Sequence, residues 1–182
     1  MKRKKIILPH LAFLSFLMLS INAYSYEPAS NYILQWTGKE QRAYTVEISV
    51  LYDKINVEAI EDSGKRKLWS LKDYVGECNV DSSIELALPS FEVVDLFSSE
   101  DKVVLFAYTI GCVGGVDPVD VKYFAFYKGK KHSLRGRESF IGVEGVTDLA
   151  PPPVPDYNLR ENKVILNYML KKWPSISARV FF

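Results

Sequence analysis

Short segments in which apolar and polar residues alternate run through most of the chain and predict β-strands. Tyr44–Val50 alternates with a period of two, which places its valines and isoleucine on one face. Ile55–Ile60 alternates in the same way, and Lys67–Leu71 resumes the pattern after a turn at residues 61–65. Consecutive short strands joined by tight turns indicate an antiparallel meander.

Further strands are expected at Ser83–Leu88, Phe91–Leu96, Val103–Ile110 and Val119–Tyr127. Val103–Ile110 is almost continuously apolar, which predicts a central strand buried on both faces. Val119–Tyr127 carries aromatic residues on both of its faces, and this favours a sheet with packing on each side. Residues 128–130 then supply a tight hairpin turn.

The chain changes character at residues 148–156, where four prolines favour an extended connector. Asn158–Glu161 then resembles the capping box of a helix N-terminus, and Pro174 marks the expected stop. One helix of about four turns is expected between them, covering one side of the sheet, and residues 180–182 form a final strand or a packed tail. Apolar residues recur at helical spacing at Val164, Ile165, Tyr168, Met169 and Trp173.

These patterns predict a mainly β protein of the α+β class, an antiparallel sheet, sandwich or half-barrel with one C-terminal amphipathic helix. We divide the chain into three parts. Residues 1–25 are a signal peptide, residues 26–147 a β-rich domain, and residues 148–182 a proline-rich connector and helix packed on the same domain. The mature length suffices for one domain with its own core.

The first 25 residues have the features of a secretory signal peptide. Four basic residues at positions 2–5 precede an apolar stretch, Ile6–Ile21, which is too short for a membrane-spanning helix. Small residues at Ala23 and Ser25 favour cleavage before Tyr26, with cleavage before Tyr24 as the alternative. The mature protein is therefore expected in the periplasm or outside the cell, without a stable transmembrane segment.

Removal of this segment changes the charge balance. The whole chain has 23 basic and 22 acidic residues, a net charge of +1. The only charged residues among the first 25 are four basic ones, so the mature chain keeps 19 basic and 22 acidic residues and has a net charge of −3. A mildly acidic exported chain is a poor candidate for binding nucleic acids, and a hydrophobic fraction of 48% excludes a wholly disordered chain.

Two cysteines and one histidine limit the chemistry of the mature protein. Cys78 and Cys112 are the only cysteines, and an even number in an exported chain predicts a disulfide, with a reactive or metal-bound thiol as the alternative. His132 is the only histidine after residue 25, and its basic segment is typical of a solvated turn. A zinc site or a Ser-His-Asp triad would lack partners, so we predict no metal, no cofactor and no catalytic residue.

The candidate ligand-binding residues are Arg135, Lys122 and Asp120. Arg135 lies between a strand end and Gly136, where a guanidinium can bind a carboxylate or phosphate through two hydrogen bonds. The alternative is an ion pair between Arg135 and Asp117 or Asp120 that holds the turn together. The same alternative applies to Lys122 and Asp120.

A wider pattern of positions spans much of the β-rich part. Its members are Trp69, Cys78, Asp95-Leu96, Val103–Tyr108, Cys112, Pro118, Lys122 and Leu134-Arg135-Gly136. This pattern resembles a family of exported bacterial proteins, mostly uncharacterised and sometimes labelled surface polysaccharide biosynthesis proteins. Phe97, Glu100 and Gly115 depart from it, the first two within a loop that resembles a calcium loop in the family. Calcium needs six to eight oxygen ligands, and the loop here supplies too few.

The signal peptide and the missing catalytic motifs favour a non-catalytic envelope protein, a binding or structural module whose partner is a protein or a glycan. One alternative is a periplasmic inhibitor or immunity protein that acts against a cell-wall-degrading enzyme. The other is a glycan hydrolase, which would pair Glu92 and Asp95 with Asp117 or Asp120. Such a pair needs carboxyl groups about 5–9 Å apart in a cleft.

Overall fold

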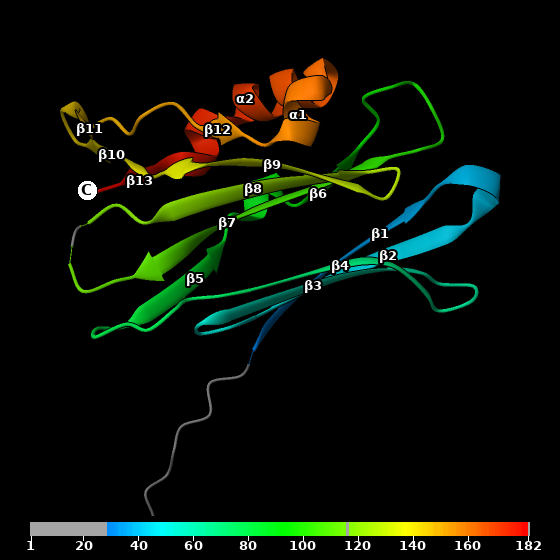
Figure 1. Cartoon of the computed structure of the whole chain (residues 1–182), viewed down its shortest axis with the longest axis horizontal. Coiled ribbons are helices and arrows are strands. Elements are labelled where there is room, and N and C mark those ends of the chain that lie inside the picture. Colours follow the sequence, from blue (N-terminus) through cyan, green and yellow to red (C-terminus); the bar gives the residue numbers. More distant parts are fainter. Residues whose placement is uncertain (1–28, 116, 182) are drawn as a thin grey trace, which may run out of the picture.

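The strands of the N-terminal half form a four-stranded antiparallel meander, sheet A (Figure 1). The computed structural model describes residues 29–115 and 117–181, so the predicted signal peptide lies outside the described residues. The strand order is β1-β2-β3-β4, and a short 3₁₀ helix separates the first two strands. The bounds are β1 Ser30–Thr37, η1 Lys39–Gln41, β2 Ala43–Leu51, β3 Lys54–Glu61 and β4 Arg66–Tyr74.

A second antiparallel sheet, sheet B, lies over sheet A and contains the most apolar strands. Its order is β12-β9-β8-β7-β5, and β6 also pairs with β7. β7 is buried from Val103 to Tyr108, as its apolar run predicts. Positive φ angles at Lys128 and Gly129 form the two-residue turn between β8 and β9. The bounds are β5 Ser82–Leu86, η2 Leu88–Ser90, β6 Glu92–Val94, β7 Val103–Cys112, β8 Asp120–Tyr127, β9 Lys130–Arg137 and β12 Val154–Pro155.

A small third sheet, sheet C, gathers strands from the C-terminal part of the chain. β10 (Ser139–Gly142) pairs with β11 (Gly145–Asp148) in antiparallel fashion and with β13 (Ala178–Val180) in parallel fashion. Of residues 180–182, expected as a final strand or a packed tail, Val180 ends β13 and Phe181 follows the strand. Arg179 of β13 is held by Glu138 through a 2.8 Å ion pair, which ties this strand to the segment between β9 and β10.

Two helices, rather than one continuous helix, follow the proline connector. α1 (Tyr157–Glu161) is capped by Asp156, and α2 (Lys163–Ser177) is capped by Asn162. The predicted capping box at Asn158 is wrong because the preceding aspartate accepts the backbone N–H of Leu159. The predicted stop at Pro174 is also wrong. The proline removes one backbone hydrogen bond, but the buried side chains of the last turn keep it helical.

Sheet B lies between sheet A and the helices, so the chain has two hydrophobic cores (Figure 1). The core between the sheets includes Val46, Ile48, Ile55, Val57, Phe106, Tyr108, Phe124 and Phe126. The core under the helices includes Leu105, Tyr123, Leu134, Leu159, Ile165, Met169 and Trp173. The aromatic residues on both faces of β8 pack into these two cores, and the predicted α+β fold class is confirmed.

The predicted disulfide is confirmed. Cys78, in the connection between β4 and β5, is bonded to Cys112 at the end of β7 with a Cα–Cα distance of 5.8 Å. The bond therefore ties the end of the sheet A meander to the central strand of sheet B. No helix in the part of the chain that the structure describes is long and apolar enough to cross a membrane.

Candidate functional site

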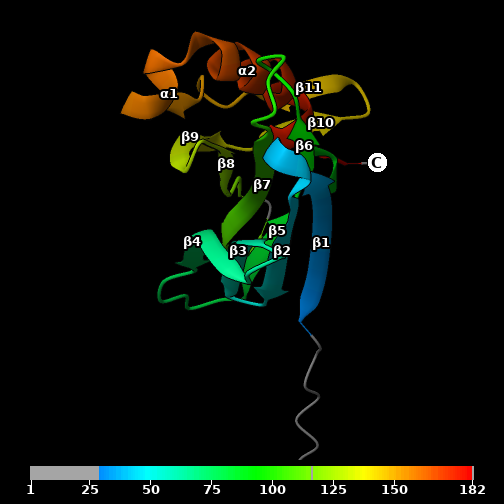
Figure 2. The ribbon, with the colours of Figure 1, turned by 90° about the vertical axis from the view of Figure 1, so that its right-hand side faces the viewer.

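On one side of the molecule, sheet B continues past β8 with β9 and the short strand β12, whereas sheet A ends at β4. β1 and β2 contact β6 and β5, whereas β4 lies under β7 and β8. The ring of Trp69 stacks on Phe126 with 3.7 Å between centroids, and Asp73 accepts a 2.7 Å hydrogen bond from the Tyr108 hydroxyl. Figure 2 shows β4 and β9 on the same side of the two sheets. The inward side chains Trp69 and Asp73 of β4 therefore contact β7 and β8.

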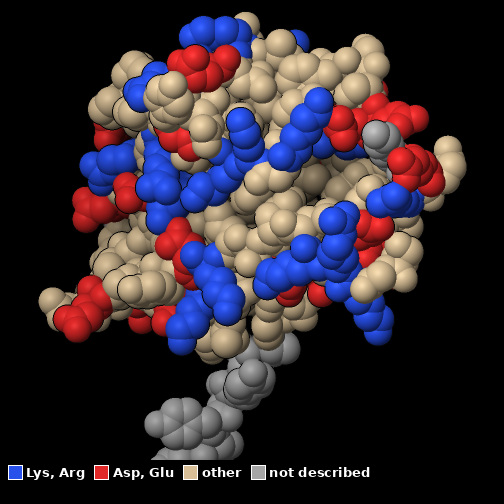
Figure 3. All heavy atoms as spheres, turned by 45° about the vertical axis from the view of Figure 1, so that its right-hand side comes forward, with Lys and Arg blue, Asp and Glu red and all other residues tan. Residues whose placement is uncertain are grey.

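Three basic side chains line the face of β9 that points toward sheet A. Residues two apart on a strand point to the same side, and Lys131, Arg135 and Arg137 all lie on this face and are exposed. We call them the β9 basic row. On this side of the molecule, Figure 3 shows Lys and Arg on both sides of a strip of uncharged residues. The face is therefore locally positive, although the mature chain has a net charge of −3.

Lys122, the neighbour of Arg135 across the β8–β9 ladder, is held in place from sheet A. Its ammonium group lies 2.6 Å from the Asp73 carboxylate, which also accepts the hydrogen bond from Tyr108. Burial raises the pKa of Asp73, but the hydrogen bonds from Lys122 and Tyr108 outweigh it, so the pKa lies below its ordinary value of 3.8. Burial and Asp73 both raise the pKa of Tyr108, which keeps this phenol protonated as a donor.

All three predicted ligand-binding residues line one hollow, together with a second arginine. The hollow has a volume of about 270 Å³ and is lined by Asp120, Val121, Lys122, Arg135, Gly136, Arg137 and Val154. Arg137 donates a 2.6 Å hydrogen bond to the carbonyl of Pro118. Arg135 forms neither of the ion pairs that were its alternative, and among the described residues no hydrogen bond or ion pair engages its guanidinium.

The hollow can therefore bind an anion. The Arg135 guanidinium is planar, permanently charged and able to donate two parallel hydrogen bonds to a carboxylate or phosphate. Lys122 stands beside it across the ladder, with its charge partly offset by Asp73. Sequence reasoning identified Arg135 and Lys122 but not Arg137 or Lys131. The only signal for these two was their position in a strand, Arg137 two residues after Arg135 and Lys131 two residues before Ser133, which places them on the same face.

An aromatic cleft lies toward the opposite end of the two sheets. Trp36 and Tyr44 are cross-strand partners stacked at 5.3 Å, and they share the cleft with Trp69 and Phe126. Its volume is about 330 Å³, and its rim carries charges of both signs, from Arg66, Glu100, Asp101, Lys102 and Lys128. The sequence predicted that aromatic residues of the strands serve packing, and Phe126 does so, whereas both tryptophans are only half-buried.

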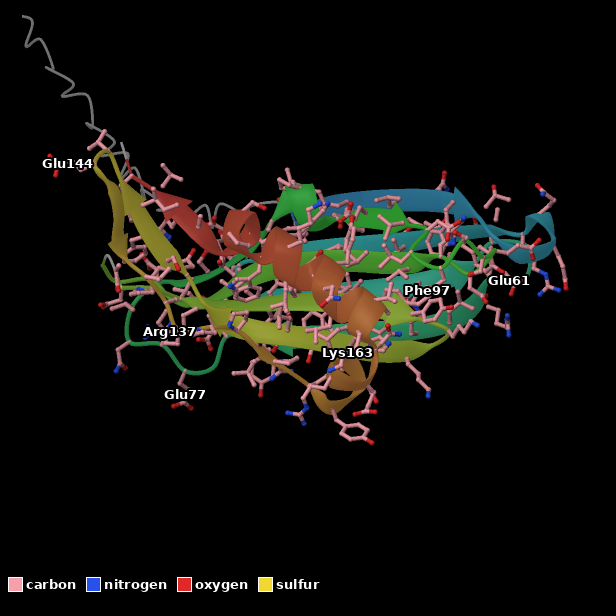
Figure 4. The ribbon with its side chains drawn as sticks, turned by 90° about the horizontal axis from the view of Figure 1, so that it is seen from above. Glu61, Glu77, Phe97, Arg137, Glu144 and Lys163 are labelled. Carbon is pink, nitrogen blue, oxygen red and sulfur yellow. A yellow bond between two sulfur atoms is a disulfide. The ribbon has the colours of Figure 1, made fainter. Side chains whose placement is uncertain are left out.

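The carboxylates of the hydrolase alternative are not brought together. Glu92 is paired with Lys172 of α2 at 2.7 Å, and Asp95 with Lys102 at 2.9 Å. Glu92 pairs with Leu105 of β7, which pairs with Ala125 of β8. Ala125 is five residues from Asp120, a separation of about 17 Å along the strand. In Figure 4, Phe97 and Arg137 lie toward opposite ends of the sheets. Phe97 is two residues after Asp95, and Arg137 is the strand partner of Asp120.

The loop that resembles a calcium loop is held together by a lysine. The Asp95 carboxylate accepts the backbone N–H groups of Phe97 and Ser99, and the Lys102 ammonium lies 2.9 Å from it. The hydrogen bond from Lys102 lowers the pKa of Asp95 despite some burial. Within residues 29–115 and 117–181, no group of three or more His, Cys, Asp and Glu side chains could hold a metal ion.

The prediction for His132 is wrong, because the residue is 4% exposed. The turn ends at Gly129, and β9 begins at Lys130. Because side chains alternate along the strand, His132 points toward the helices, on the same face of β9 as Leu134. Burial lowers its pKa, and its Nδ1 atom has no hydrogen-bond partner among the described residues. The histidine therefore belongs to the packing under α1 rather than to an exposed site.

No family model, curated protein or solved structure matches this chain. Four members of the wider sequence pattern, Trp69, Tyr108, Lys122 and Arg135, lie on the faces of sheets A and B that point toward each other. The interpretation of the site rests on these residues and their neighbours.

Proposed function

We propose that this protein is an exported, non-catalytic binding module of the bacterial envelope, which holds an anionic partner against the β9 basic row. The observation that carries the proposal is Arg135. Its guanidinium is exposed, unengaged by any described residue, and flanked on the same face by Lys131 and Arg137. A guanidinium in this state is available for a bidentate contact with a carboxylate or phosphate.

The rigidity of the surroundings supports a binding role. β9 is paired along its whole length with β8, and Lys122 is fixed by Asp73 from the opposite sheet. Cations that are already positioned lose less conformational entropy when a ligand binds. A basic face on a chain of opposite net charge also directs an anionic partner to one side of the molecule.

The disulfide supports the exported location, because such bonds persist in oxidising compartments. We expect the mature chain to begin at Tyr26 and to occur in the periplasm or outside the cell. Mass spectrometry of the mature protein and cell fractionation test this part directly. A chain that keeps residues 1–25 and remains in the cytoplasm would contradict it.

The binding role is tested with the mature chain, residues 26–182, and two defined anionic probes, polyglutamate and polyphosphate. We expect binding that weakens as salt rises and that Arg135→Gln weakens by about fivefold. Arg160→Gln is the matched control, because Arg160 is an exposed arginine on α1, on the opposite side of sheet B. Equal effects of the two substitutions, or no binding of either probe, would overturn the proposal. Turnover of a cell-wall glycan would contradict the non-catalytic role.

A further inference from the structure

The edge of β4 is a free strand edge beneath an overhanging strand. β4 pairs with β3 on one side, and no described strand pairs with its other side. A free edge presents a row of backbone N–H and C=O groups that can pair with another extended chain. Sheet A thus ends at β4, whose inward side chains contact β7 and β8, whereas sheet B continues with β9 and β12.

A strand added beside β4 would occupy the position under β9. Neighbouring strands lie about 4.8 Å apart and stacked sheets about 10 Å apart, so the added strand would face β9 across the ordinary distance between packed sheets. Its inward side chains would meet Lys131 and Arg135 directly. The loop that carries Glu77 projects past the sheets at the end where Arg137 lies (Figure 4).

The charges select the sequence of such a strand. Side chains on one face of a strand recur every second residue, about 6.8 Å apart, in β9 and in any strand that lies along it. A peptide with acidic residues at every second position therefore presents carboxylates opposite Lys131, Arg135 and Arg137, and one more opposite Ser133. On the outer face of sheet A, β4 carries the exposed Lys72, which also favours an acidic chain.

Basic residues along an edge commonly protect it from pairing with arbitrary strands. Lys67 and Arg66 of β4 form ion pairs with Glu58 and Glu61, whereas no described residue forms a hydrogen bond or ion pair with Arg135 of β9. The Arg135 guanidinium is therefore available for a carboxylate of an added strand. A glycan could satisfy the cations, but it lacks the regular row of amide groups that the edge of β4 would pair with.

We infer that this site binds an extended acidic peptide segment of a partner protein, which adds to sheet A beside β4 and places alternate carboxylates against Arg135 and Lys131. The inference rests on the proposed binding function and names the chemistry of its partner. Main-chain pairing with β4 supplies affinity, and the alternating acidic side chains supply specificity.

The probe is an eight-residue peptide in which glutamate alternates with threonine, titrated against the mature chain by calorimetry. The control peptide has the same composition, but its residues are arranged as two glutamates followed by two threonines. It keeps the charge of the first peptide and loses the alternation. Two further versions carry N-methyl groups on all the glutamates or on all the threonines, because successive residues of a strand direct their N–H groups to opposite edges. A galacturonate oligomer of equal charge represents a glycan.

We expect the alternating peptide to bind more than about tenfold more tightly than the paired one, and only one of the two methylated versions to lose binding to a similar extent. Hydrogen exchange should slow in residues 66–74 when the alternating peptide binds, and Arg135→Gln but not Arg160→Gln should weaken it. If the galacturonate oligomer binds as tightly and neither methylation matters, strand addition is overturned while anion binding stands. If no anionic probe binds, both proposals fail.

Discussion

Asp73 is the side chain that joins the two sheets beneath the proposed site, and its removal gives the sharpest test of the structure. The carboxylate accepts hydrogen bonds from the Tyr108 hydroxyl at 2.7 Å and from the Lys122 ammonium at 2.6 Å. In Asp73→Ala, Lys122 can turn toward water because its side chain is 20% exposed. Tyr108 is fully buried, so its hydroxyl would lose its only described acceptor.

The expected cost follows from these two groups. A hydrogen bond to a charged acceptor contributes about 1.5–3 kcal/mol, and an unsatisfied buried donor costs about 1–3 kcal/mol. We therefore expect Asp73→Ala to lower the free energy of unfolding by about 3 kcal/mol. Tyr108→Phe keeps the ring and leaves Asp73 its bond with Lys122, so its cost should be about 1 kcal/mol. The double variant should be no less stable than Asp73→Ala, because it contains no unsatisfied hydroxyl.

Urea unfolding of the four proteins, followed by tryptophan fluorescence at neutral pH, measures this cycle. Costs that add in the double variant, or a cost below about 1 kcal/mol for Asp73→Ala, would refute the role of Asp73. A pH series adds a second readout. Because the pKa of Asp73 is lowered in the folded state, its contribution is present above its unfolded value of 3.8. The difference between wild type and Asp73→Ala should therefore shrink as the pH falls through the folded pKa.

Three further predictions concern the cores and the disulfide. Replacing Cys78 and Cys112 by serine removes a link between residues 34 positions apart, and should lower the free energy of unfolding measured in urea by about 3–4 kcal/mol. His132→Gln should reduce the loss of stability on acidification below about pH 6.5, since burial lowers the folded pKa of this histidine and protonation favours the unfolded chain; an unchanged pH profile would contradict its buried neutral state. Gly136→Ala should lower the melting temperature through about 1–3 kcal/mol of overpacking, because its Cβ would lie 2.7 Å from the indole of α2. Gly64→Ala, with no atom within 4 Å, is its matched control.

Much of the fold could be predicted from local patterns. The alternation in Tyr44–Val50 and Ile55–Ile60 identified two strands of sheet A, and the apolar run at Val103–Ile110 identified the central strand of sheet B. These segments are predictable because a strand that is buried on one or both faces must carry apolar residues at the corresponding period. The disulfide was predictable because only one pair of cysteines was available.

β9 shows where local pattern fails. Its first four residues, Lys130 to Ser133, are all polar. The sequence therefore suggested that the turn continued through His132. The segment is nevertheless a strand because it pairs with β8 along its whole length and is covered by the helices on one face. The same pairing turns His132 inward and leaves Arg135 on the opposite, open face.

The sequence by itself determined which segments are strands with buried faces, which side chains carry charge, and which two cysteines can be joined. These properties depend on neighbours along the chain and on composition. The tertiary structure alone decided that Arg135 has no acidic partner among the described residues, that Lys122 is held by Asp73 from 49 positions away, and that no described strand pairs with the outer edge of β4. Each of these depends on how two sheets of unequal width stack, and no local periodicity records that offset.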